Sequence, residues 1–178
     1  VDFGGGRSVY NYDGSWNWMT NKDDIHLMLP WDNGTDEVLV ADFGEGRRIW
    51  TYDGTWNWLI NKDDVNAMAV WNNKLVVDFS KNRRLYTYDG TTWTWISNKD
   101  YVTRLVPWND GTDKLGVDFG AGRGLYYYDG SWHWMRNDDD VPEMIAWGNK
   151  LAVDFGSGVG VYSYDGSWLL LDDRSTAD

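Results

Sequence analysis

The residues best suited to chemistry are tryptophans that recur in pairs, two positions apart, each pair followed by an asparagine and an aspartate. Because side chains alternate between the faces of a strand, both indoles of a pair are expected on one face. An aromatic face beside amide and carboxylate acceptors suits a sugar, whose C–H face stacks on the ring while its hydroxyls form hydrogen bonds. The candidate sugar-binding residues are the second tryptophan of each pair with its Asn and Asp: Trp18, Asn21 and Asp23; Trp58, Asn61 and Asp63; Trp95, Asn98 and Asp100; Trp134, Asn137 and Asp139.

The two tryptophans of a pair are expected to have different surroundings, the first in the core and the second half exposed on an outer strand. The first is present five times, at Trp16, Trp56, Trp93, Trp132 and Trp168. In the last copy Leu170 stands where the second tryptophan would be. The alternative for the Asn-x-Asp segments is that they simply end one repeat and start the next, so both hypotheses stay open.

The tryptophans belong to a longer phrase that recurs five times along the 178 residues. Each copy contains an Asp-Phe dipeptide, a short turn segment, an aromatic run, Tyr-Asp-Gly and a tryptophan. The first aspartate recurs at intervals of 40, 36, 40 and 36 residues, at Asp2, Asp42, Asp78, Asp118 and Asp154. Such a period marks a repeat architecture in which each repeat stacks on its neighbours. The alternation of two intervals indicates duplication of a two-repeat ancestor.

Each repeat predicts short antiparallel strands. In the third copy the β-prone runs are 74–79, 85–88, 93–96 and 102–108. Asp89-Gly90 lies between two alternating runs, a pattern typical of a hairpin. The glycine-rich segments that follow the Asp-Phe dipeptides also predict hairpin turns. A helix is the alternative for residues 24–31, but Pro30 disfavours it.

Four short strands in about 38 residues are typical of one propeller blade. We therefore expect an all-β, single-domain, five-bladed β-propeller over residues 1–178, with repeats 1–39, 40–75, 76–115, 116–151 and 152–178. The last repeat has three strand runs, which gives 19 strands rather than 20. Either one blade is three-stranded, or the chain is trimmed, or a partner supplies a strand.

The phrase resembles bacterial repeats related to the FG-GAP and VCBS propeller modules, most closely over residues 31–43 and 108–119. The resemblance implies a propeller fold. Five blades of this size are also similar in architecture to tachylectin-2, a lectin with one sugar site per blade. That second likeness implies multivalent sugar binding as an expectation about function.

In the related modules a loop before the Asp-Phe strand can bind calcium, and two loops here correspond to it. Residues 32–36 and 109–113 each offer two carboxylates, whereas calcium takes about six to eight oxygen ligands. An Asx-type turn is the simpler expectation for both loops. We therefore expect no cofactor, with calcium as the alternative.

The aspartates of the Asp-Phe dipeptides are expected to be structural, because they recur in every repeat. An arginine follows five residues later in four repeats, at Arg7, Arg47, Arg83 and Arg123. The expected role is to hold neighbouring backbone or this arginine at the hairpin, and ligand binding by the pair is the alternative.

Composition excludes several classes of function. The net charge of −12 repels nucleic-acid phosphates and anionic lipid surfaces. The sequence contains no run of about 18 apolar residues, the length that would predict insertion into a membrane. Cysteine is absent, which leaves the redox compartment open and is compatible with a bacterial secreted protein, so we expect an extracellular or cell-surface location. An enzyme is not expected, because His26 and His133 occupy unrelated positions and no nucleophile motif is present.

Two functions fit this pattern. The first is a multivalent lectin, in which several weak sites on one scaffold give avidity for glycans. The second is a non-catalytic structural or adhesion module that associates with itself or with another chain through an unpaired strand or an exposed apolar patch.

Overall fold

The computed structural model describes residues 1–3, 8–22, 25–44, 46, 48–60, 65–79, 84–99, 101–120, 122–137, 141–156 and 158–173. The chain divides into two compact units, Val1–Val65 and Asn66–Asp178, and each is described by itself. Every regular element among these residues is a β-strand, which confirms the all-β class. Correspondingly, the described segments include no helix long and apolar enough to cross a membrane.

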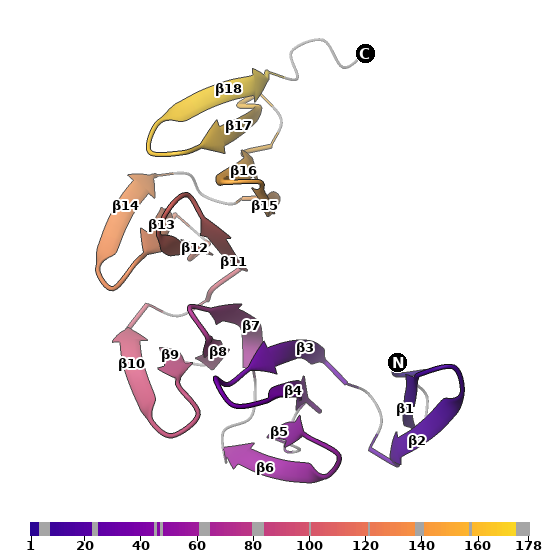
Figure 1. Ribbon diagram of the computed structural model, residues 1–178. Helices are drawn as coiled ribbons and strands as arrows, with labels where there is room; N and C mark the ends of the chain where they lie inside the picture. Colours follow the sequence, from indigo (N-terminus) through magenta and orange to yellow (C-terminus); the bar gives the residue numbers. More distant parts are fainter. Residues whose placement is uncertain are drawn as a thin grey trace. The chain divides into compact units, whose positions relative to one another are not determined.

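The first unit holds one two-stranded and one four-stranded antiparallel sheet (Figure 1). The hairpin consists of β1 (Val9–Tyr12) and β2 (Trp16–Thr20). The sheet has the order β3-β4-β5-β6, with bounds Leu27–Asp32, Glu37–Asp42, Ile49–Tyr52 and Trp56–Ile60. Because β3 covers most of residues 24–31, the helix considered for that segment is wrong.

The second unit holds three four-stranded sheets, each formed by consecutive strands. The first contains β7 (Val65–Trp71), β8 (Lys74–Phe79), β9 (Leu85–Tyr88) and β10 (Trp93–Ser97). The second contains β11 (Arg104–Asn109), β12 (Asp113–Asp118), β13 (Leu125–Tyr128) and β14 (Trp132–Arg136). The third contains β15 (Glu143–Trp147), β16 (Lys150–Asp154), β17 (Val161–Tyr164) and β18 (Trp168–Asp172).

The number of strands differs by one from the expected 19. The described residues form 18 strands. The first Asp-Phe copy contributes only an isolated bridge between Asp2 and Val9, in the place where a further strand was expected. In the other four copies the aspartate is the last or next-to-last residue of a strand that pairs with a neighbour on each side. These strands are β4, β8, β12 and β16.

The hairpin turns are stabilised by the aspartate of Tyr-Asp-Gly. The Asp89 carboxylate accepts the backbone N–H groups of Thr91 at 2.9 Å and Thr92 at 2.8 Å. Asp13 and Asp53 accept the amide two residues later in the same way. This Asx geometry confirms the predicted hairpin between β9 and β10.

Each pairing of an aromatic strand with a tryptophan strand contains a β-bulge. In the β9–β10 pair, Trp95 faces Tyr86 but Ser97 faces Leu85, so Ile96 is the extra residue. The same shift occurs in the other four hairpins of this kind. A bulge leaves its extra residue outside the ladder and re-aims the side chains that follow.

The core lies between successive sheets rather than within any one of them. In the second unit Trp71, Val76 and Leu85 of one sheet cluster with Val117 and Phe119 of the next. In the first unit, residues of the β1–β2 hairpin cluster with Ala41 and Phe43 of the neighbouring sheet. No sheet buries its apolar face alone, which is the behaviour expected of stacked repeats.

Candidate functional site

The contact between two successive sheets is here called a junction. At two junctions a tryptophan donates a hydrogen bond to a bulge. The Trp132 indole Nε1–H donates to the carbonyl oxygen of Ile96 at 2.7 Å. In the first unit, Trp56 Nε1–H donates to the carbonyl of Met19 at 3.1 Å. Ile96 and Met19 are the extra residues of their bulges. The bulge therefore frees a carbonyl that the next sheet satisfies.

The expected core position of the first tryptophan is confirmed in part for Trp56 and Trp132, which pack against the core clusters, and is wrong for Trp16. Trp56 and Trp132 are partly buried, because each indole reaches across a junction rather than into a sheet interior. Trp16 is 54% exposed.

A pocket of about 340 Å³ lies at the junction between the β7–β10 sheet and the β11–β14 sheet. Its walls come from the end of β10 and the segment after it, and from the aromatic side chains of the following sheet. The lining residues are Trp95, Ile96, Ser97, Asn98, Lys99, Phe119, Tyr126 and Trp132. Two of the predicted sugar-binding residues, Trp95 and Asn98, are thus brought together on one pocket.

The second tryptophan of each pair is half exposed, as expected. The exposed fractions are 57% for Trp18, 53% for Trp58, 50% for Trp95 and 61% for Trp134. An indole that is open to solvent on this scale has surface available to a ligand. Four such rings recur at equivalent positions of the repeat.

Lys99 extends over the aromatic wall of the pocket. Its ammonium nitrogen lies 3.6 Å from the ring centroid of Tyr126 and 5.1 Å from that of Phe119. The Lys99 backbone N–H donates to the Ser97 hydroxyl at 3.0 Å, which fixes the turn after β10. The ammonium is therefore held by cation–π attraction at the pocket wall.

A cation covers the aromatic wall of the other junctions as well. In the first unit the Lys22 ammonium lies 3.0 Å from the Trp50 ring centroid, and burial lowers the pKa of this lysine. At the junction between the β11–β14 and β15–β18 sheets, the Arg136 guanidinium lies 4.3 Å from the centroid of Phe155. Sequence analysis missed these cations, although the recurrence of Lys in three Asn-Lys-Asp segments was a signal for them.

The structure describes only some of the remaining predicted site residues. Asn21, Asn98 and Asn137 are exposed and follow the tryptophan strands directly. Asp23, Asn61, Asp63, Asp100 and Asp139 lie outside the described residues.

The aspartates of the Asp-Phe dipeptides hold the backbone of their own turn and of the segment that leads into the next sheet. Asp118 is fully buried, and its carboxylate accepts the N–H groups of Gly120 at 3.1 Å and Val141 at 3.3 Å. Asp78 accepts the Val102 N–H in the same way, at 3.2 Å. The structural role expected from their recurrence is confirmed. Of the four arginines paired with them, only Arg123 is described, and its guanidinium lies 4.9 Å from a tyrosine ring centroid.

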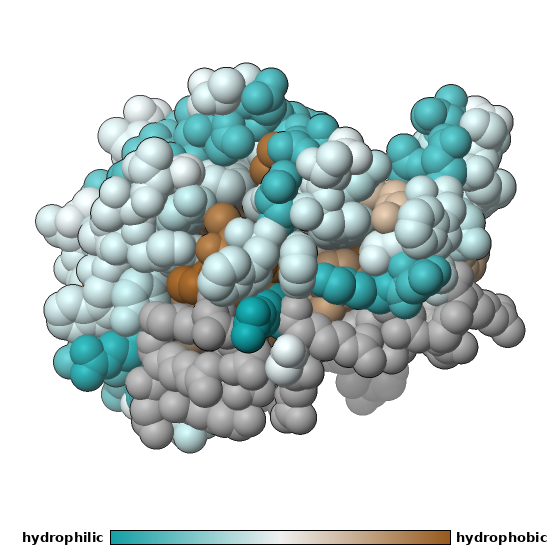
Figure 2. Space-filling view, turned by 90° about the horizontal axis from the view of Figure 1, so that it is seen from below, coloured by the Kyte–Doolittle hydropathy of each residue, from teal (hydrophilic) through white to brown (hydrophobic). Residues whose placement is uncertain are grey.

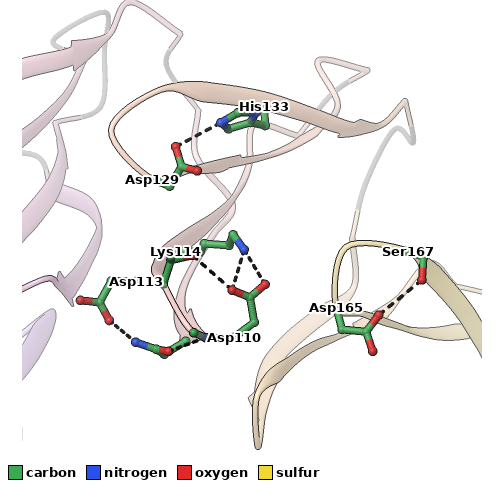
Figure 3. Close-up of polar contacts among 10 residues, drawn as sticks. Asp110, Asp113, Lys114, Asp129, His133, Asp165 and Ser167 are labelled. Carbon is green, nitrogen blue, oxygen red and sulfur yellow. Dashed lines mark hydrogen bonds and ion pairs between the residues drawn. The ribbon is translucent and has the colours of Figure 1, made fainter.

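The two loops considered for calcium form Asx turns. Asp32 accepts the N–H of Gly34 at 2.8 Å, and Asn109 accepts that of Gly111 at 2.8 Å. In the second loop both oxygens of Asp110 contact the Lys114 ammonium (Figure 3). Within the described ranges, no group of three or more potential ligands is arranged to hold a metal ion.

His133 belongs to a hairpin turn. Its Nε2 lies 3.1 Å from a carboxylate oxygen of Asp129, at the hairpin between β13 and β14 (Figure 3). In the first repeat Asn17 donates to Asp13 from the equivalent position, at 3.0 Å. His133 therefore performs the turn-stabilising contact that an amide performs elsewhere.

The junction pocket combines aromatic faces, an amide and an ammonium. This set can hold a small ligand that has one apolar face and polar edges. Comparisons with protein-family models, with curated proteins and with solved structures gave no significant match.

Proposed function

We propose that this chain is a five-bladed β-propeller that binds carbohydrates, without catalysis, at repeated sites beside the second tryptophan of each pair. The observation that carries the proposal is the half-exposed Trp95 on a pocket of about 340 Å³ that Asn98 also lines. The ring would stack on the C–H face of a sugar, and the amide would bond its hydroxyls.

The size of the pocket suits a single sugar ring. Small-molecule sites in proteins usually have volumes of about 300–1,000 Å³, and this one lies at the lower end of that range. One ring buried in a shallow site binds weakly. Four half-exposed tryptophans at equivalent positions would compensate through avidity for a surface that displays many copies of one glycan.

The recurring sequence phrase supports the proposed fold and the number of sites. Its resemblance to FG-GAP and VCBS modules supports the propeller, and the architectural likeness to tachylectin-2 supports one site per blade. Glycan binding by a strongly acidic, cysteine-free chain is consistent with a role outside the cell or at its surface.

A glycan array, run with calcium and then with a chelator, tests the proposal. Consistent binding to one terminal sugar in both conditions supports a metal-independent lectin. Loss of binding with chelator would instead implicate the loops around Asp32 and Asn109.

A matched pair of variants then locates the site. Trp95→Ala should lower the number of sugars bound per chain in calorimetry and leave the circular dichroism spectrum unchanged. Trp147→Ala is the control, because Trp147 is 57% exposed on β15 and does not line the pocket. Equal loss of binding in both variants would contradict a site at Trp95.

A second candidate function is supported by the last strand. β18 is the outer strand of its sheet, and Leu169, Leu170 and Leu171 on it are 58%, 46% and 44% exposed. An exposed apolar edge strand is a typical surface for association with another chain. On the face drawn in Figure 2, by contrast, strongly hydrophobic residues occupy only small areas among hydrophilic ones. Sedimentation velocity of the wild type and of Leu170→Lys tests this: association that the variant abolishes would favour an interaction module.

A further inference from the structure

We infer that the junction pocket beside Trp95 selects acidic sugars, with the Lys99 ammonium binding the carboxylate of the sugar ring. The inference rests on the proposed carbohydrate binding and adds the class of ligand. The polar side chains of the pocket that have no partner among the described residues determine which ligand it can bind.

Two of the polar side chains in the pocket are already engaged. The Ser97 hydroxyl accepts the Lys99 backbone N–H at 3.0 Å. The Trp132 indole N–H donates to the Ile96 carbonyl at 2.7 Å. The exposed Asn98 amide, the Trp95 indole N–H, the Tyr126 hydroxyl and the Lys99 ammonium remain. The ammonium is the one charged group among these four, so it is the strongest recognition group that the described lining offers.

Lys99 differs from other lysines of the same unit in its electrostatic partners. The Lys114 ammonium pairs with Asp110 at 2.5 Å, and that of Lys150 pairs with Asp165 at 2.7 Å. Among the described residues, Lys99 has no carboxylate partner and contacts only aromatic rings. Within the described part of the chain, its three N–H donors have no hydrogen-bond partner, so they can bind an anionic oxygen of a ligand.

A second cation lies near Trp95. The Arg84 guanidinium is 5.5 Å from the Trp95 ring centroid. Arg84 has a φ of 76°, in the left-handed region that favours glycine, and Gly124 and Gly160 occupy the same position in the last two repeats. Arg48 adopts a φ of 72° and lies 5.4 Å from Trp58 in the same way. The backbone thus holds an arginine over the stacking tryptophan in two repeats.

Two cations thus lie beside Trp95, one of them on the pocket wall, in a chain whose net charge is −12. The long-range field repels polyanions, while the local contacts attract one carboxylate. A single acidic sugar satisfies both conditions: its ring stacks on Trp95 and its carboxylate reaches Lys99. The ligand class is therefore a terminal acidic monosaccharide, of the uronic acid type, rather than a polyanionic glycan chain.

The test compares glucuronate with its methyl ester, which removes the charge and keeps the ring. Binding is followed at one site by two-dimensional NMR, through the Trp95 indole N–H signal, assigned by its loss in Trp95→Phe. In the wild type, glucuronate should bind about tenfold more tightly than the ester, since a hydrogen bond to a charged group is worth about twice a neutral one.

Three lysine variants isolate the ammonium. Lys99→Gln should reduce the ratio of glucuronate affinity to ester affinity from about tenfold to about one. Lys99→Arg should retain the preference, which shows that charge rather than packing at Tyr126 is responsible. Lys114→Gln is the matched control, because its ammonium is already paired with Asp110.

The possible outcomes separate this inference from the proposed function. Equal affinity for glucuronate and ester in the wild type would overturn the acidic-sugar inference while supporting carbohydrate binding. A preference that persists in Lys99→Gln would also overturn it. If neither probe shifts the Trp95 signal and the glycan array is blank, the proposed function fails and the inference fails with it.

Discussion

The two junctions of the second unit place a cation over the same kind of aromatic pair by different routes. At the first, Lys99 follows β10 by two residues and covers Phe119 and Tyr126. At the second, Arg136 is the last residue of β14 and covers Phe155 and Tyr162. The residue that corresponds to Lys99 in that repeat is Asp138.

Both junctions have a cation over aromatic rings of the following sheet. The aromatic pair and a covering cation are retained although the cation comes from a different position. A guanidinium also stacks flat on a ring, whereas an ammonium acts as a compact point charge with three mobile donors. The Lys99 junction is therefore the better suited of the two to exchange its cation contact for a ligand.

The largest expected effect is a loss of stability when the tryptophan at each junction is replaced by alanine. Trp132 donates to the Ile96 carbonyl, whereas Trp168 contacts Phe155 at 5.3 Å and makes no hydrogen bond within the described residues. Trp132→Ala should lower the free energy of unfolding by about 3 kcal/mol. Trp168→Ala should cost about 1 kcal/mol less, because no bonded carbonyl is left unsatisfied. Denaturant unfolding measures both, and equal losses would show that the bulge contact contributes nothing.

A smaller effect is expected from removing each cation. Lys99→Met and Arg136→Met should each lower the free energy of unfolding by about 1 kcal/mol, the usual range for a partly exposed cation–π contact. Lys99→Arg should be close to neutral. If Lys99→Met stabilises the protein while Arg136→Met destabilises it, the two junctions do not share one stabilising contact.

The smallest effect concerns the outer turn of the β7–β10 sheet. Hydrogen bonds from the Thr92 and Thr91 amides and the Thr91 hydroxyl lower the pKa of Asp89 to about 2. A lowered pKa in the folded state favours folding above pH 3.8, the ordinary value, and this contribution disappears as the pH falls through about 2. NMR titration of the Asp89 carboxyl carbon checks the pKa. Asp89→Asn should reduce the acid dependence of unfolding, and an ordinary pKa for Asp89 would contradict the turn geometry.

The strands themselves could be predicted because their signals are local. Residues 74–79 and 85–88 correspond to β8 and β9, since alternation, β-branched residues and the Asp89 turn all act within a few positions. The exposure of Trp95 also followed from its place on an outer strand. These features depend on neighbouring residues in the sequence.

The junction could not be predicted, because it depends on pairing across strands and between repeats. The bulge at Ile96 is a property of the register of β9 and β10, which no single strand encodes. Phe119 and Tyr126 come from the following repeat, so the pocket has no contiguous sequence pattern. For the same reason the hydrogen bond from Trp132 to the Ile96 carbonyl could not be predicted from the sequence.

The most direct test of the central claim is a glycan array that compares the wild type with a variant in which Trp18, Trp58, Trp95 and Trp134 are all alanine. These indoles are at least half exposed, so the variant should keep the wild-type circular dichroism spectrum. The account predicts that the wild type binds one class of terminal sugar and that the variant binds none. Unchanged glycan binding by the folded variant, or a blank array for the wild type, would contradict it.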